Sequence, residues 1–373
     1  MKLTLQIQLL PDKRQAAEMR KTIEAFNEAC NWLAGQAFKR QTANKVLLQK
    51  LFYSELRSRF LLSAQMAVRC IAQVSEAFKR DKSIRPRFRP HAAIPLDQRL
   101  MGFKSVSRVS IRTLEGRIIV GMIMGAYQRE RFTMLVGQSD LVLRKDGKWF
   151  LLVTVSLPDG APIPATDFLG VDLGVKNIAT TSDGEKSDGE EVEKVRQKYH
   201  RQRQSLQQRA ARQKQQGRRP KNVRRKLKKI SQRESRFRRQ INHQIAKAIV
   251  EEAKGSGRGI ALEDLKGIRT RVTFRRQQRA RMAGWSFYQL RVFIEYKARL
   301  IGVVVVTVDP RNTSRTCSEC GYCDKANRRS QSEFVCLSCG HSEQADVNAA
   351  KNIRLRAKVD WPTVSESQEA DAA

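Results

Sequence analysis

Two pairs of cysteines have the spacing of a metal-binding site. Cys317 and Cys320 form a CSEC motif, and Cys336 and Cys339 form a CLSC motif. Thiolates three residues apart on a tight turn can both reach one ion, and the fifteen residues between the pairs match a two-knuckle zinc site. The motifs predict one Zn²⁺ held by four cysteines, with two disulfides as the alternative.

Two nearby residues could replace one of these ligands. Cys323 is a fifth thiol close to the first pair, and His341 carries an imidazole directly after Gly340. The paired spacing favours the cysteines of the two motifs. With all four positions of a tetrahedral ion filled by thiolates, the site should be structural rather than catalytic.

Three acids form a second group of candidate residues. Asp172 lies within an apolar run, Glu263 ends another, and Asp346 lies at the start of a predicted helix. Carboxylates that converge at strand ends could hold two Mg²⁺ ions, about 3.5–4 Å apart, and hydrolyse a phosphodiester. Spacing alone leaves the choice open, because the chain has 37 acids and Asp264 and Asp309 are competitors.

The stretch FLGVDLGVKNIATTSDG (168–184) predicts two strands, with Asp172 alone in the apolar part. A buried carboxylate costs several kcal/mol unless a partner compensates it. Gly170 and Gly174 flank this acid and would leave room for a metal or a phosphate. Capping of a turn by a strand-end aspartate is the alternative interpretation.

The segments before this stretch divide into a helical part and a β part. The first nine residues alternate in polarity, as a half-buried strand does. Apolar residues then recur every three or four positions over 11–83, which predicts a helical bundle with Cys30 and Cys70 in its core. An RPRFRP motif breaks this pattern, and residues 84–157 predict short strands, including a hairpin at the Asp-Gly of 146–147.

After the stretch the chain becomes strongly basic. Residues 196–239 contain nineteen Lys and Arg and one acid, and Gly217 and Pro220 interrupt them. We expect two basic helices joined by a turn. We also expect these helices to contact nucleic acid, because positive charges this numerous repel one another unless phosphates neutralise them.

Three further elements are expected before the cysteine motifs. Residues 259–265 predict a short strand that ends in acids, and an amphipathic helix begins at Gly284. The β-branched run at 302–310 predicts a buried central strand.

The composition narrows the class of partner. The 373 residues include 72 Lys and Arg against 37 acids, a formal net charge of +35. This excess favours a polyanionic partner. No apolar run approaches the roughly 18–20 residues of a membrane-spanning helix, and no secretory signal is recognised. We therefore expect a cytoplasmic protein that binds nucleic acid and no membrane.

Three segments resemble the RuvC motifs and the zinc ribbon of TnpB. They are GVDLGVKNIATTSDG, GIALEDLKGIR and TSRTCSECGYCDKANRRSQSEFVCLSCGHSEQADVNAAKNI. TnpB is the RNA-guided nuclease of bacterial and archaeal insertion-sequence transposons, and it is related to the type V CRISPR effectors. The order of the motifs, with the ribbon between the second and third acids, is specific. The resemblance covers residues 1–356.

The resemblance implies an α/β multidomain fold with an RNase H-like RuvC nuclease domain. A four-cysteine zinc ribbon is inserted into this domain, and a split β-barrel wedge domain and a helical recognition domain precede it. The expected limits are 1–10 and 84–165 for the wedge domain, 11–83 for the recognition domain, 166–312 and 344–356 for the nuclease domain, 313–343 for the ribbon, and 357–373 for a disordered tail.

The resemblance also assigns the site. Asp172, Glu263 and Asp346 match the catalytic, metal-binding carboxylates of the family, which selects them over the two competing aspartates. The cysteines of the two motifs match its zinc ligands, and Cys323 lies outside the pattern. The implied cofactors are two catalytic Mg²⁺ and one structural Zn²⁺.

The implied function is RNA-guided cleavage of double-stranded DNA. The partners would be a guide RNA from the transposon end and target DNA beside a short transposon-adjacent motif, and a monomer at the prokaryotic nucleoid is expected. The rivals are a nuclease-inactive RNA-guided repressor, which would lack one or more acids, a compact type V CRISPR effector, and a transposase that joins strands itself.

Overall fold

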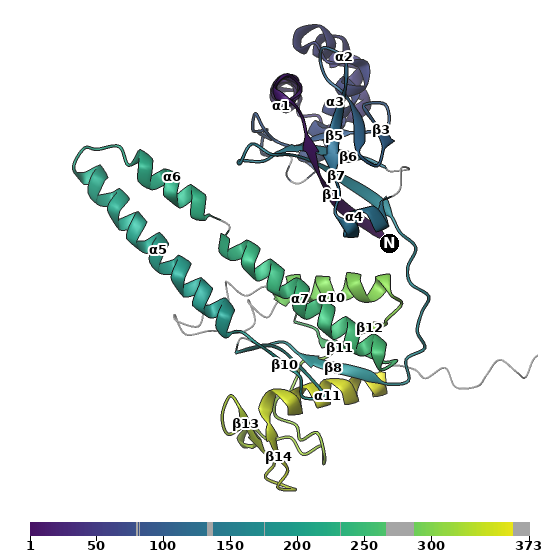
Figure 1. The fold of residues 1–373 in the computed structure, drawn as a ribbon, viewed down its shortest axis with the longest axis vertical. Helices are drawn as coiled ribbons and strands as arrows, with labels where there is room; N and C mark the ends of the chain where they lie inside the picture. The colour runs from purple at the N-terminus through teal and green to yellow at the C-terminus, as the bar shows by residue number, and fades with distance from the viewer. Residues whose placement is uncertain are drawn as a thin grey trace, which may run out of the picture. The chain divides into compact units, whose positions relative to one another are not determined.

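The chain folds into two compact units, Met1–Pro158 and Asp159–Ala373 (Figure 1). The computed structural model describes residues 1–79, 81, 83–132, 137–174, 176–231, 233–265 and 287–360. In this part of the chain, no helix has the length and apolar character needed to cross a membrane. The start of the helix predicted from Gly284 and residues 361–373 of the expected tail lie outside the described residues.

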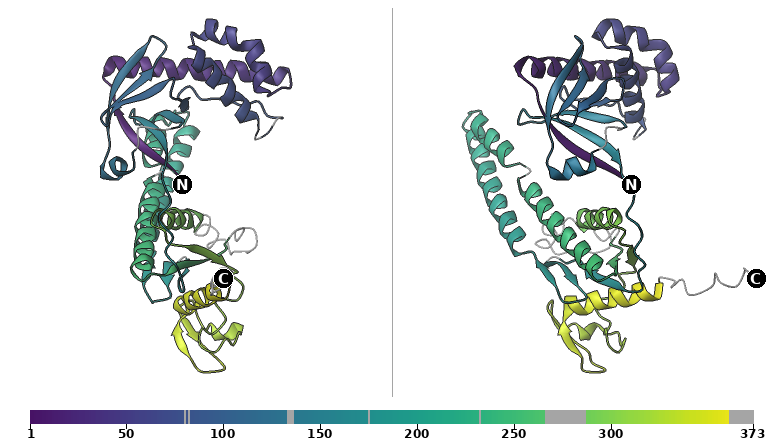
Figure 2. Two further views of the ribbon diagram at one scale, coloured as in Figure 1. Left: turned by 90° about the vertical axis from the view of Figure 1, so that its right-hand side faces the viewer. Right: turned by 45° about the vertical axis from the view of Figure 1, so that its right-hand side comes forward.

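The first unit contains a curled antiparallel sheet of seven strands (Figure 2). The order is β2 (Ile94–Leu96), β6 (Ser139–Leu143), β7 (Trp149–Ser156), β1 (Lys2–Leu10), β5 (Arg117–Ile123), β4 (Arg108–Arg112) and β3 (Met101–Ser105). β1 pairs with both β7 and β5, and its Leu5, Ile7 and Leu9 are buried, as their alternation predicts. The predicted hairpin joins β6 to β7.

Helices α1 (Lys13–Lys39), α2 (Lys45–Phe60) and α3 (Ala64–Phe78) share one apolar core with this sheet. α1 begins where the side chain of Asp12 accepts a hydrogen bond from the N–H of Gln15. Cys30 and Cys70 are buried in the core, as predicted, with their sulphurs 3.4 Å apart. A short helix α4 (Ala126–Arg131) interrupts the region for which only strands were predicted.

The second unit contains a mixed sheet of five strands. The order is β10 (Lys186–Asp188), β9 (Asn177–Thr181), β8 (Phe168–Asp172), β11 (Gly259–Glu263) and β12 (Val305–Val308). β8 is antiparallel to β9 and parallel to β11, which is parallel to β12. The two strands predicted in 168–184 are therefore found as β8 and β9.

Helices cover both faces of this sheet (Figure 1). Helices α7 (Arg233–Gly255) and α10 (Phe287–Leu300) pack on Leu169 and Val171 of β8, and α11 (Ala345–Asp360) packs on Phe168. α11 lies so close that a Cβ at Gly170 would be 2.0 Å from the carbonyl oxygen of Ala350. The glycine is explained by this helix contact, whereas we expected it to leave room for a metal or a phosphate.

The strand predicted to be central lies at an edge of the described sheet. β12 pairs with β11 on one side and ends the strand order. Its valines pack on both sides of the sheet, although Thr307 is exposed. Val305 packs with the core beneath α10, and Val306 and Val308 pack with the core beneath α11. A β-branched run indicates packing against the faces of a strand, and an edge strand can have such packing as well as a central one.

The basic region forms helices α5 (Glu190–Gln215) and α6 (Lys221–Ile230) and the first turns of α7. The break at Gly217 and Pro220 is found as predicted. A second break between Ile230 and Arg233 was not predicted, since no proline or glycine marks it. At the far end of the unit, α11 continues to Asp360, beyond residue 356, where we expected the last domain to end.

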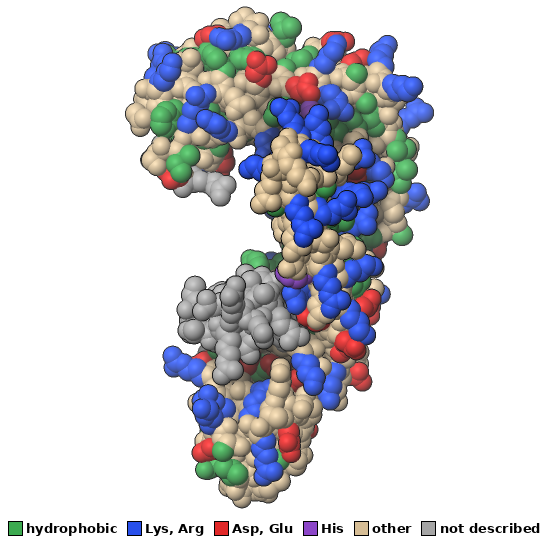
Figure 3. Space-filling view, turned by 90° about the vertical axis from the view of Figure 1, so that its left-hand side faces the viewer, with side chains coloured by type: hydrophobic (Ala, Val, Ile, Leu, Met, Phe, Trp, Pro, Cys, Tyr) green, Lys and Arg blue, Asp and Glu red, His purple; other side chains and the backbone are tan. Residues whose placement is uncertain are grey.

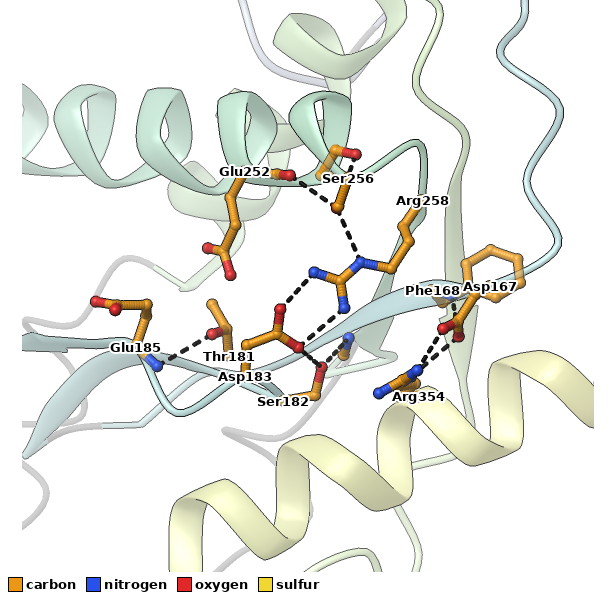
Figure 4. A network of polar contacts seen from close by, with 12 residues as sticks. Asp167, Phe168, Thr181, Ser182, Asp183, Glu185, Glu252, Ser256, Arg258 and Arg354 are labelled. Atoms are coloured by element: carbon orange, nitrogen blue, oxygen red, sulfur yellow. Dashed lines mark hydrogen bonds and ion pairs between the residues drawn. The ribbon is translucent and has the colours of Figure 1, made fainter.

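A network of ion pairs joins the start of β8 to neighbouring elements (Figure 4). Asp167 accepts hydrogen bonds from Arg354 of α11 and lies 3.1 Å from Nζ of Lys358. Arg258, before β11, binds Asp183 in the turn after β9. Burial alone would raise the pKa of Asp167, but the hydrogen bonds from Arg354, from the N–H of Phe168 and from Lys358 lower it to about 2.

We expect Asp167→Asn to destabilise the second unit by about 1–2 kcal/mol at pH 7, after allowance for solvent screening. Because the folded pKa is depressed, the stabilisation is complete above the unfolded value of about 4 and is lost as the pH falls through about 2. Urea unfolding at pH 7 and pH 3 measures it, and the difference should shrink at pH 3. Glu251→Gln, in an exposed pair with Lys247, is the control. An equal effect of the two variants at pH 7 would contradict the assignment.

Candidate metal centres

The four cysteines of the two motifs come together. Their sulphurs all lie within 4.8 Å of one another, with Cys320 and Cys336 3.5 Å apart and Cys317 and Cys339 3.7 Å apart. Four sulphurs about 2.3 Å from a tetrahedral zinc ion would be about 3.8 Å apart. None of these four cysteines forms a disulfide. We call them the thiol group, and its geometry fits one tetrahedral ion.

Each pair lies on a tight turn that a glycine completes. Gly321 and Gly340 have φ angles of 76° and 73°, and their N–H groups donate to the carbonyls of Cys317 and Cys336. Backbone hydrogen bonds from Cys339 and then Ser338 lower the pKa of the Cys336 thiol to about 6. A thiolate, the form that binds metal, is thus favoured at this position.

The two possible substitutes lie outside the thiol group. Cys323 is exposed, and its backbone forms a bridge with Thr316. Nε2 of His341 lies 3.6 Å from a carboxylate oxygen of Glu343. The four sulphurs that converge are therefore those of the two predicted pairs.

Buried asparagines fasten the segment that carries the thiol group to α11. Asn348 accepts a hydrogen bond from the N–H of Ser318 (3.0 Å) and donates to the carbonyl of Thr316 (2.8 Å). Asn352 donates to the carbonyls of Thr313 (2.9 Å) and Thr316 (2.7 Å). Both asparagines are less than 5 % exposed. These hydrogen bonds, which were not predicted from the sequence, fix the first turns of α11 to the segment that carries the thiols.

The three predicted acids also converge, and we call them the acid site. Leu262 of β11 lies beside Val171 of β8, so Glu263 and Asp172 end adjacent parallel strands. Side chains alternate along a strand, and two positions earlier Gly170 and Ala261 face α11. Asp346 lies in the first turn of α11, on this same face.

The other two acids lie close enough to Asp172 to shift its pKa. Burial, and after it Glu263 and Asp346, raise the pKa of Asp172 to about 8. Burial also raises the pKa of Glu263. Such a group of acids favours a bound cation. Its oxygens are spaced more widely than the sulphurs, because among the described residues only the thiol group has all its ligand atoms within 4.8 Å.

The competing aspartates have other partners. Asp264 lies one residue after Glu263, and its Oδ1 is 3.0 Å from Arg291 of α10, the helix on the opposite face of the sheet. Asp309 accepts a hydrogen bond from the N–H of Arg311.

Three residues without a predicted role contact the acids. Nδ2 of Asn177 donates to Oδ2 of Asp346 (2.8 Å), and Nη2 of Arg328 donates to Oδ1 of the same carboxylate (3.1 Å). The hydroxyl of Thr313 donates to Glu263. Asn177 follows Asp172 by five residues within the motif GVDLGVKNIATTSDG, so its closeness in the sequence could have indicated a contact with the acids. Arg328 and Thr313 are brought to the acids only by the fold.

The basic helices, α5, α6 and the start of α7, present Lys and Arg to solvent (Figure 3). Val192 and Val223 are the buried residues of α5 and α6. Arg203 of α5 forms an ion pair with Glu234 of α7 at 2.7 Å. Glu234 is the single acid within residues 196–239. Most of the positive charge therefore remains available to an external polyanion.

Comparison with known proteins gives two family matches. Residues 152–266 match the OrfB_IS605 model, described as a probable transposase, and residues 287–353 match the Cas12f1-like TNB domain. These matches make the chain similar to OrfB-type transposon proteins and to Cas12f proteins. It is also similar to a TnpB-like protein of Methanocaldococcus jannaschii, which is 35 % identical over 34 % of this chain and 45 % of its own length.

Individual relatives agree with this assignment. The endodeoxyribonuclease Cas12f1 of Syntrophomonas palmitatica is 30 % identical over 67 % of this chain and 52 % of its own length. Cas12f1 of Sulfoacidibacillus thermotolerans is 31 % identical over 70 % of this chain and 61 % of its own length. The chain thus spans about half to three-fifths of these two relatives. InsQ of Escherichia coli K12 is 26 % identical over 93 % of this chain and 90 % of its own length.

Solved structures share the fold along almost the whole chain. A Cas12f1–sgRNA–target DNA complex matches 95 % of this chain and 98 % of its own with a TM-score of 0.62 at 13 % identity. The mini RNA-guided endonuclease Cas_phi3 matches 97 % and 93 % with a TM-score of 0.58 at 12 % identity. At these identities the similarity establishes the α/β multidomain fold.

Proposed function

We propose that this protein is an RNA-guided DNA endonuclease of the TnpB kind, which cleaves double-stranded DNA. The convergence of Asp172, Glu263 and Asp346 at the ends of β8 and β11 and the start of α11 carries the proposal. The names of the Cas12f1 relatives, endodeoxyribonucleases, support it. A guide RNA from a transposon end and a short motif beside the target would be its partners, at the nucleoid in the cytoplasm.

The domain assignment is part of the proposal. The five-stranded mixed sheet with α7, α10 and α11 would be the RNase H-like RuvC domain, and the segment with the thiol group would be its zinc ribbon. The seven-stranded sheet would be the wedge domain, and α1–α3 the recognition domain. The order of strands in the mixed sheet, with β8 between β9 and β11, supports the first assignment.

The acid site would hold two Mg²⁺ ions. Its residues fit, since three oxygen-bearing side chains share one face and burial together with the other two acids raises the pKa of Asp172. Bound ions would supply activation of a water and stabilisation of the leaving oxygen of the phosphodiester. Thr313 orients Glu263, and Arg328 places a positive charge beside Asp346. The thiol group would hold one Zn²⁺ whose role is structural.

The basic helices would hold RNA through its phosphates, while base pairing reads the target sequence. We expect that replacing four exposed charges of α6 by glutamine weakens guide-RNA binding and makes its salt dependence shallower, by up to about 0.7 in slope for each phosphate that is no longer neutralised. The residues are Arg224, Arg225, Lys228 and Lys229. Filter binding at salt concentrations between roughly 50 and 200 mM measures the effect.

A matched control removes the same charge from α1 and α2. Its residues, all exposed, are Lys13, Arg20, Lys45 and Lys50. A salt slope that is unchanged in the α6 variant would show that α6 does not bind the RNA. An equal change in both variants would show that the effect is not specific to α6.

The proposed function is tested by the RNA that accompanies the protein. We expect a short RNA to co-purify and to direct Mg²⁺-dependent cutting of DNA that matches its guide portion. Sequencing this RNA and supplying matched and mismatched DNA measures both steps. Absence of a bound RNA, or cutting that ignores the match, would exclude the proposal.

The Cas12f1 relatives favour one second candidate, a compact type V CRISPR effector. The source of the RNA separates the two, because a CRISPR RNA contains repeat sequence whereas a transposon guide contains the end of the element. The presence of all three acids disfavours a nuclease-inactive repressor. Strand joining without RNA would instead identify a transposase, the class described by the matching OrfB model.

A further inference from the structure

We propose that Asn177 is a positioning residue of the acid site, which orients the carboxylate of Asp346 for metal binding. The inference rests on the proposed function, because it assigns Asn177 to the ions held by the three acids. Its basis is the hydrogen bond from Nδ2 of Asn177 to Oδ2 of Asp346, at 2.8 Å. The bond joins the start of β9 to the first turn of α11.

An irregularity in β9 turns Asn177 towards α11. Ala179 pairs with Ser187 of β10, and Asn177 pairs with the next residue, Asp188, so Ile178 is an extra residue in β9. Ile178 and Ala179 both pack in the core beneath α7 and α10. In a regular strand Asn177 would share the face of Ala179, but the extra residue reverses its direction. A bulge that re-aims one side chain is a feature found beside functional sites.

The backbone on both sides of Asn177 is fixed as well. A Cβ at Gly174 would lie 2.7 Å from the carbonyl oxygen of Asn177, so the backbone of Gly174 lies closely against this residue. The carbonyl of Lys176 accepts a hydrogen bond from the N–H of Gly189 at 2.8 Å. The amide of Asn177 is therefore presented from a constrained position.

The two donors to Asp346 differ in charge. Arg328 places a cation at Oδ1, whereas Asn177 holds Oδ2 with a neutral amide. Each carboxylate oxygen has two lone pairs, so the hydrogen bond from Asn177 leaves one on Oδ2 for a metal ion. A neutral donor orients the carboxylate without placing a second positive charge beside a bound metal ion. The side chain of Asp346 is 11 % exposed, so few waters could take the place of this donor.

Loss of a hydrogen bond to a metal-binding carboxylate commonly lowers metal affinity or activity by about 10–100-fold. We therefore expect Asn177→Leu, which has a similar volume and no donor, and Asn177→Ala to bind Mn²⁺ at the acid site about 10–100-fold more weakly. Electron paramagnetic resonance of free Mn²⁺, titrated into the zinc-loaded full chain without nucleic acid, measures this directly. Asp172→Ala identifies the signal that belongs to the acid site.

Cleavage provides an independent readout. The Mg²⁺ concentration for half-maximal cleavage should rise in the Asn177 variants, the rate at saturating Mg²⁺ should recover to within about threefold, and guide-RNA binding should not change. Lys176→Ala, at the exposed neighbouring position, is the control and should behave like the unaltered chain. Thermal unfolding checks that each variant is folded.

The outcomes separate this inference from the proposed function. Unchanged Mn²⁺ affinity in folded Asn177 variants overturns the inference and leaves the nuclease assignment standing. A uniform loss of cleavage at every Mg²⁺ concentration, with unchanged Mn²⁺ affinity, also overturns it, because Asn177 would then serve the fold alone. If the unaltered chain has no Mn²⁺ site that Asp172→Ala removes, the acid site of the proposed function fails and the inference fails with it.

Discussion

We expect the substitution of Asp172 by asparagine to abolish the proposed cleavage of guide-matched DNA and to leave guide-RNA binding close to that of the unaltered chain. Asparagine keeps the shape of the side chain and removes the charge, so the acid site loses one of its three anionic ligands. The substitution does not change the basic helices, which are separate elements of the unit. Single-turnover cleavage and RNA binding, measured on the same preparation, test both parts of the result.

Stability should move in the opposite direction to activity. In the metal-free protein, burial and the two neighbouring acids disfavour the charge of Asp172. Asp172→Asn should therefore raise the thermal midpoint without added Mg²⁺, which is typical of a side chain retained for function. Asp309→Asn, in an exposed carboxylate near Arg311, is the matched control and should retain cleavage. A variant at position 172 that still cuts would remove the acid from the site.

Cys336→Ser has the second large expected effect, loss of both the bound zinc and cleavage. Structural zinc sites contribute on the order of 10–16 kcal/mol of apparent binding free energy to small domains, so the segment with the thiol group should unfold without the ion. Asn348 and Asn352 would lose their backbone partners in this segment, and the turn that carries Asp346 would no longer be fixed.

Elemental analysis should show one zinc per chain before the change and none after it. Cys323→Ser is the control, because this thiol is exposed and outside the thiol group, and it should retain zinc and cleavage. Zinc loss in the control, or full cleavage by zinc-free Cys336→Ser, would contradict the structural role. The first unit, which has a separate core, should unfold at an unchanged temperature in both variants.

Local patterns in the sequence predicted local structure well. The apolar spacing over 11–83 predicted a helical bundle, which is found as α1, α2 and α3. The two cysteine motifs match the thiol group. Both predictions rest on residues close in the chain. The acid site is different. Its three residues lie on separate elements, and spacing left Asp264 and Asp309 open until the resemblance to TnpB selected among them.

Other features depend on contacts that no local pattern encodes. The role of Gly170 follows from the approach of α11, which is distant in sequence. The direction of Asn177 depends on one extra residue in β9, and periodicity predicts the opposite face. Our prediction that β12 is a central strand was wrong, because apolar composition reports burial and says nothing about strand neighbours.

Contacts along helix α11 constrain the spacing of its residues from Asp346 to Arg354. Asp346 accepts a hydrogen bond from Asn177, and the backbone of Ala350 lies against Gly170. Asn352 donates to the carbonyl of Thr313, and Arg354 binds Asp167, so successive turns each have a separate partner. Inserting one residue rotates everything beyond it by about 100° and advances it by about 1.5 Å. Several partners would then be displaced together. The spacing between Asp346 and Arg354 along α11 is therefore constrained by several partners at once.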